Sequence, residues 1–79
     1  MAVIVVTGAN SGIGRAAAVH LAAAGHAVHG AMRDLGKAGK LHDEAAAAGA
    51  SVHEVELDVS DDESVRRGIQ GVLDAEGRI

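Results

Sequence analysis

The chain has 79 residues, a net charge of −4 at neutral pH, and no cysteine, proline or aromatic residue. Its length allows one small domain at most, and the lack of a basic run and of aromatic rings for base stacking argues against nucleic-acid binding. No apolar stretch is long enough to span a membrane, no basic flank indicates a secretory signal, and the lack of cysteines fits a reducing compartment, so we expect a cytoplasmic protein.

The first apolar stretch leads into a glycine-rich turn and then into an alanine-rich segment. Residues 3–6 are Val-Ile-Val-Val, an unbroken aliphatic run typical of a parallel strand buried on both faces. The alanine-rich segment predicts a helix that begins at residue 12 or 13 and stops at Gly25. We expect its sheet-facing side to contain Ile13, Ala17, Leu21 and Ala24.

Three glycines in this turn have different predicted roles. Gly8 permits the tight exit from the strand, Gly12 lets a ligand approach the backbone, and Gly14 lets the helix pack close to the sheet. The free N–H groups at the helix start and the positive end of the helix dipole favour a bound phosphate. The alternative is an ordinary strand-turn-helix unit without a ligand.

The second strand-helix unit has a weaker pattern than the first. Residues 26–32 predict a short strand that His29 and Gly30 interrupt. Asp34 is a suitable N-cap for a helix over residues 35–48, which the following glycine would end. Because the apolar face of this helix contains only Leu41 and alanines, we expect it to be the most exposed and mobile helix.

The third unit has a clear helix signal. Residues 51–57 alternate apolar and polar side chains, which predicts a third strand. Ser60 and Glu63 form a capping-box pattern in which Ser60 is the N-cap, and Gly77 marks the helix end. The predicted apolar stripe of this helix consists of Val65, Ile69, Val72 and Leu73.

Three strand-helix units in succession predict an α/β fold. Right-handed crossovers place the strands in a three-stranded parallel sheet of order 3-2-1 with three helices, which is a partial Rossmann fold. The first strand, the most hydrophobic, would then be an unpaired edge that invites another strand. In a doubly wound sheet that neighbour is a fourth strand, and the sequence stops where such a strand would begin.

The sequence Thr7-Gly8-Ala9-Asn10-Ser11-Gly12-Ile13-Gly14 resembles the cofactor motif of the short-chain dehydrogenase/reductase family. Its glycine spacing, Gly-x3-Gly-x-Gly, differs from the commonest dinucleotide fingerprint. The resemblance implies a nicotinamide dinucleotide held through its ADP half. Asn10 and Ser11 would donate to phosphate oxygens, and Ile13 would contribute only its backbone amide. The implied cofactor-binding residues of the turn are Thr7, Gly8, Asn10, Ser11, Gly12, Ile13 and Gly14.

The end of the second strand indicates which dinucleotide is preferred. Sites for NAD usually place an acid there to hold the ribose hydroxyls, but this chain has Ala31-Met32-Arg33 and no carboxylate before Asp34. A guanidinium in that position favours a 2′-phosphate, so we predict that Arg33 binds the phosphate of NADP(H). The alternative is that Arg33 is a solvated loop residue and Asp34 only a helix cap.

After the third strand, Asp58-Val59 resembles the Asp-Val element of the same family. The resemblance implies that Asp58 accepts a hydrogen bond from the adenine amino group and that Val59 contacts the ring. The alternative is that Asp58 is a turn residue. The five histidines have no metal-ligand spacing and no cysteine beside them, so we predict no metal site.

Family chemistry implies a catalytic Tyr, Lys and Ser well beyond this length, and the chain contains no Tyr. We therefore expect no catalytic residue here, and interpret residues 1–79 as the N-terminal part of a Rossmann NADP(H)-binding domain, truncated before its fourth strand. The parent would be an oxidoreductase transferring hydride between the cofactor and a carbonyl or alcohol. Two alternatives are a structural fragment that self-associates through its first strand or third helix, and a non-catalytic NADP-binding module.

Overall fold

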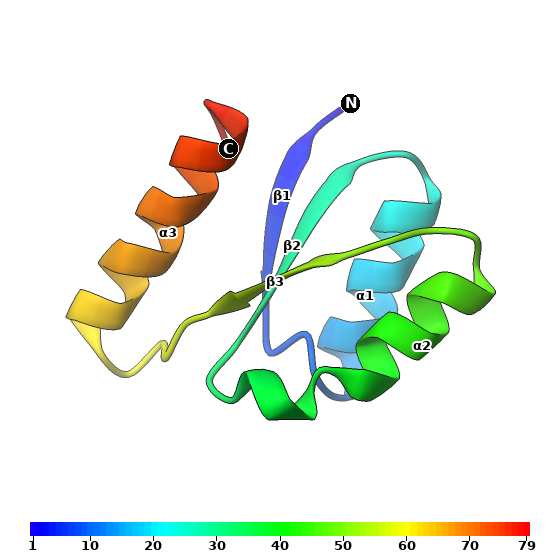
Figure 1. Cartoon of the computed structure of the whole chain (residues 1–79), viewed down its shortest axis with the longest axis horizontal. Helices are drawn as coiled ribbons and strands as arrows, with labels where there is room; N and C mark the ends of the chain where they lie inside the picture. Colours follow the sequence, from blue (N-terminus) through cyan, green and yellow to red (C-terminus); the bar gives the residue numbers. More distant parts are fainter.

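The computed structural model describes all 79 residues, Met1–Ile79. The elements in chain order are β1 (Val3–Thr7), α1 (Gly12–Ala23), β2 (Ala27–Met32), the short 3-10 helix η1 (Leu35–Lys37), α2 (Gly39–Ala47), β3 (His53–Glu56) and α3 (Asp62–Glu76). The three strands are parallel and lie in the order β1-β2-β3, which confirms the predicted topology. Helices α1 and α2 cover one face of the sheet, and α3 lies on the other side (Figure 1).

The main core lies between the sheet and the pair α1 and α2. Its largest fully buried side chains include Leu41 of α2 and Val28 of β2, and Ala18 of α1 packs in the same cluster. A methyl group on Gly30 would lie 3.0 Å from Leu41 Cδ2, so this glycine makes room for Leu41. Seven of the nine residues of α2 are exposed, a larger share than in α1 or α3, as expected from its weak apolar face, although its single leucine fills the space that Gly30 leaves open.

Helix α1 faces the sheet only partly through the predicted residues, since Leu21 packs against the core while Ile13 and Ala24 are exposed. Ala18 is fully buried, while Ile13 is 90% exposed. Gly14 is the residue that faces the carbonyls of the turn. Because successive residues of a helix point about 100° apart, the preceding residue, Ile13, points away from that contact. The prediction for Ile13 was therefore wrong, because close packing at Gly14 fixes the rotation of the helix.

The second helical segment is divided into two parts. Asp34 caps η1 as predicted, with Oδ1 accepting from the Gly36 amide at 2.9 Å. The continuous helix expected over 35–48 is instead interrupted at Ala38, which is 3% exposed and belongs to the core. Glycines at positions 36 and 39 weaken α-helix formation on both sides of this break.

The N-cap of α3 is Asp61, not Ser60. Asp61 Oδ1 accepts from the amides of Glu63 and Ser64 at 3.0 and 3.4 Å. The Ser60 hydroxyl instead donates to Asp58 Oδ1 at 2.7 Å, so the predicted capping box was wrong. The helix ends at Gly77, as predicted, with this glycine in the left-handed conformation (φ 79°).

The sheet-facing row of α3 is also shifted relative to the predicted stripe. Ser64, Gly68 and Val72 are its buried residues, four positions apart. Val65 and Ile69 are half-buried, and Leu73 is 37% exposed. Gly68 brings the helix close to β3, because a methyl group there would lie 2.7 Å from Leu57 Cδ1.

We expect Asp61→Ala to lower the free energy of unfolding by about 1 kcal/mol, because two amides of the first turn of α3 lose their acceptor. Ser60→Ala is the matched control and should cost less, since the Ser60 bonds lie at an exposed turn. Urea unfolding followed by far-ultraviolet circular dichroism measures both variants. A larger loss for Ser60→Ala would contradict this assignment of the cap.

Candidate cofactor site

A hollow of about 280 Å³ lies at the carboxyl edge of the sheet, where all three strands end. Parallel strands of a Rossmann sheet bring their carboxyl ends to this edge, where such folds bind ligands. This volume is close to the lower limit of small-molecule sites, about 300 Å³. The hollow therefore has room for one part of a dinucleotide and not for the whole molecule. Its lining residues are Gly8, Asn10, Met32, Arg33, Asp34, Lys37, Leu57, Asp58 and Val59.

The hollow brings together half of the residues predicted from the sequence. Gly8 and Asn10 follow β1, Arg33 follows β2, and Asp58 and Val59 follow β3. The other predicted residues lie beside the hollow, at the end of β1 or at the start of α1. These residues are Thr7, Ser11, Gly12, Ile13 and Gly14.

The turn after β1 has the backbone that its glycines were predicted to allow. Gly8 and Gly12 have φ values of 66° and 53°, which are strained for other residues. A methyl group on Gly14 would collide with the Gly8 carbonyl oxygen and lie 2.8 Å from the Gly8 carbonyl carbon. Gly14 therefore sets the close approach between α1 and the turn.

The first amides of α1 are free to meet a ligand. Ser11 is the N-cap residue but forms no side-chain cap. The first bond from α1 to the turn is that of the Arg15 amide to the Ser11 carbonyl, at 3.3 Å. The amides of residues 12–14 thus have no carbonyl partner in the turn, and unpaired amides of this kind favour an anion.

Asp58 is held as a carboxylate. The Ser60 hydroxyl donates to its Oδ1 at 2.7 Å and the Ser60 amide at 3.0 Å, and these bonds, with the charge of Arg33, lower the pKa of Asp58 below its ordinary 3.8. Asp58 is therefore an acceptor at neutral pH. Because its pKa is lowered in the folded state, any stability it contributes is present above pH 3.8 and is lost as the pH falls through the lowered value.

Four lining residues were not among the predicted site residues, namely Met32, Asp34, Lys37 and Leu57, and Lys37 is the basic one. The prediction of one continuous helix gave no reason to place it beside Arg33, whereas the 3-10 turn brings both into one hollow. The four-residue spacing between the two basic residues was the only sequence signal that could have revealed it.

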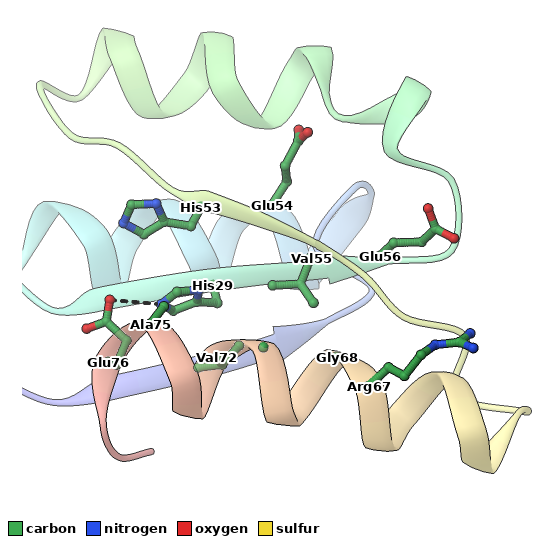
Figure 2. Close-up of a pocket in the computed structure, with 11 residues that line it drawn as sticks. His29, His53, Glu54, Val55, Glu56, Arg67, Gly68, Val72, Ala75 and Glu76 are labelled. Carbon is green, nitrogen blue, oxygen red and sulfur yellow. Dashed lines mark hydrogen bonds and ion pairs between the residues drawn. The ribbon is translucent and has the colours of Figure 1, made fainter.

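A second cavity, of about 460 Å³, lies between α3 and the strands β2 and β3, and it contains no predicted site residue. Figure 2 shows His29 of β2 and Glu76 of α3 pointing toward each other, with 3.3 Å between Nε2 and Oε1. The His29 and His53 rings stack with their centroids 4.9 Å apart.

No group of three or more possible metal ligands occurs in the structure, and no helix has the length and apolar character needed to cross a membrane.

A parallel sheet with a glycine-rich turn at its carboxyl edge defines the class of Rossmann-type nucleotide-binding folds. The family model described as short chain dehydrogenase matches residues 2–79. The chain therefore belongs to the short-chain dehydrogenase/reductase family, whose members bind a nicotinamide dinucleotide.

Known proteins of this family resemble the chain over nearly all of its length. An uncharacterized oxidoreductase of Myxococcus xanthus is 48% identical over 71 residues, which are 90% of this chain and 28% of that protein. A short-chain dehydrogenase/reductase structure from Burkholderia xenovorans, described as putative, has a TM-score of 0.91 and 36% identity, covering 98% of this chain and 31% of that one. A metagenomic short-chain oxidoreductase in complex with NADP has a TM-score of 0.87 and 38% identity, covering 96% and 34%. The chain thus spans about a third or less of these proteins.

Proposed function

We propose that residues 1–79 are the N-terminal, ADP-binding part of an NADP(H)-dependent short-chain oxidoreductase, ending before the fourth strand of its Rossmann domain. The observation that carries this proposal is the single hollow shared by Gly8, Arg33 and Asp58, one from the end of each strand. The open edge of β1 and the share of each relative that the chain covers support the domain assignment. The parent enzyme would transfer hydride between the nicotinamide and a carbonyl or alcohol.

The residues of the hollow fit the ADP half of the cofactor. The amides of residues 12–14 and the dipole of α1 would hold the pyrophosphate, with Asn10 and Ser11 as further donors. The Asp58 carboxylate would accept from the adenine amino group, and the exposed Val59 side chain would contact the ring. When bound, the cofactor supplies or accepts the hydride, but this chain has no Tyr for proton transfer.

NADP(H) fits the end of β2 better than NAD does. Arg33 is exposed, and its guanidinium forms no hydrogen bond or ion pair within the protein. Asp34, the only carboxylate there that could hold ribose hydroxyls, already accepts from the Gly36 amide. The guanidinium is thus free for a 2′-phosphate, while one oxygen of the Asp34 carboxylate caps η1.

The proposal is tested by isothermal titration of the purified chain with NADPH, 2′,5′-ADP and 5′-AMP. We expect 2′,5′-ADP to bind more tightly than 5′-AMP, because only the former carries the 2′-phosphate. We also expect no steady-state oxidation of NADPH with carbonyl substrates. Equal affinity for the two nucleotides would contradict NADP(H) preference, and turnover would contradict the assignment as a non-catalytic part.

We also propose that the isolated chain self-associates through β1 or α3. The β1 strand is an edge of the sheet, and its residues Ile4, Val5 and Val6 are only half-buried. An unpaired apolar edge tends to accept another strand. Sedimentation should therefore show dimers or larger species at micromolar concentrations, and a monomer throughout that range would contradict this proposal.

A further inference from the structure

We infer that Lys37 is a second cationic contact for the 2′-phosphate of the cofactor, beside Arg33. The inference rests on the proposed function and extends it to a residue that determines specificity. It starts from the placement of the two side chains in the hollow at the carboxyl edge of the sheet.

Backbone and cap contacts fix the position of Lys37. Its amide donates to the Asp34 carbonyl at 3.1 Å, and Asp34 Oδ1 accepts from the Gly36 amide at 2.9 Å. The next bond, from the Ala38 amide to the Leu35 carbonyl at 3.2 Å, closes the turn, and Ala38 is buried in the core. The short turn thus holds Lys37 on the same hollow as Arg33.

The two cations lack protein partners, whereas the two acids of the hollow have them. No hydrogen bond or ion pair involves the side chain of Lys37 or of Arg33. By contrast, Asp58 Oδ1 accepts from two Ser60 donors, and Asp34 Oδ1 accepts from Gly36. A ligand entering this hollow therefore meets two free cations beside two carboxylates that already accept hydrogen bonds.

The charge of the free cations matches a phosphate monoester. Such a group carries about 1.5 to 2 negative charges at neutral pH, more than a single guanidinium neutralises. The phosphates of a pyrophosphate bridge carry about one charge each and are assigned to the amides at the start of α1. The two carboxylates of the lining carry the opposite charges, so the preference for a ribose phosphate monoester over an unphosphorylated ribose comes from the free donors of Arg33 and Lys37 and not from the net charge of the hollow.

The experiment is isothermal titration of the chain and of Lys37→Gln with 2′,5′-ADP and with 5′-AMP. We expect Lys37→Gln to weaken 2′,5′-ADP by about two- to fivefold, as for a solvent-exposed charge pair, and to leave the affinity for 5′-AMP essentially unchanged. Lys37→Arg should retain most of the affinity. Lys40→Gln, which removes an exposed cation outside the hollow, is the matched control and should change neither ligand.

Unchanged affinity for 2′,5′-ADP in Lys37→Gln would overturn the inference, as would equal losses for the two ligands. If Arg33→Ala still lowers 2′,5′-ADP affinity in that case, the proposed function stands and only the role of Lys37 is wrong. If the unmodified chain binds both nucleotides equally, the 2′-phosphate site itself is wrong and both proposals fail.

Discussion

Gly14→Ala should lower the free energy of unfolding by about 2–3 kcal/mol, although alanine favours a helix more than glycine does. The added methyl group would collide with the Gly8 carbonyl oxygen and lie 3.1 Å from that of Thr7. Both atoms belong to the backbone, so relief requires α1 to move away from the turn. A domain of this size has a total stability of roughly 4–12 kcal/mol, so the loss is a large share of it.

Far-ultraviolet circular dichroism in urea is the suitable measurement, because the chain has no aromatic residue for fluorescence. Gly71→Ala is the matched control, since a methyl group there meets no atom within 4 Å in the interior of α3. We expect that control to raise stability by about 0.5–1 kcal/mol. If the two variants were equally stable, the close approach of α1 to the turn would be wrong.

Arg33→Ala should weaken 2′,5′-ADP by about 1.5–3 kcal/mol, or about ten- to 150-fold, with little change for 5′-AMP. The reason is the loss of a charge-assisted contact between the guanidinium and the 2′-phosphate. Arg33 forms no hydrogen bond or ion pair within the protein, so its removal leaves no buried group unpaired. Its charge also acts on Asp58, which would face the adenine of both nucleotides, so the difference between the two affinities reports the contact with the 2′-phosphate.

Calorimetric titration of both nucleotides measures this effect. Arg66→Ala is a suitable control, because Arg66 is an exposed cation on α3 that lines neither cavity. It removes the same charge from the protein and should leave both affinities unchanged. Equal losses for the two nucleotides in Arg33→Ala would remove Arg33 from the 2′-phosphate site and return it to the role of a solvated loop residue.

Several features of the fold could be predicted because they depend on local chemistry. The aliphatic run before Gly8 predicted a strand, and the glycines predicted the turn and its close approach at Gly14. The order of strands followed from right-handed crossovers. Because residues after parallel strands meet at one edge, the sequence also predicted that Arg33 and Asp58 lie close to the turn.

Other features could not be predicted, because they depend on contacts between distant segments. The exposure of Ile13 follows from the rotation of α1 that Gly14 imposes. Burial of Leu41 depends on Gly30, a residue that in the sequence only weakened a strand pattern. The N-cap of α3 is Asp61 and not the predicted Ser60, because the Ser60 hydroxyl donates its hydrogen bond to Asp58.

The sequence by itself determined the α/β class, the parallel topology and the glycine-rich turn, since each follows from propensity, spacing and chain handedness. Only the tertiary structure decided that Lys37 shares the hollow with the predicted Arg33 and Asp58. The physical reason is that a short cap at Asp34 and a buried Ala38 set the direction of the chain after β2. The order of residue types along the chain does not predict that direction, because the direction depends on contacts between segments that are distant in the sequence.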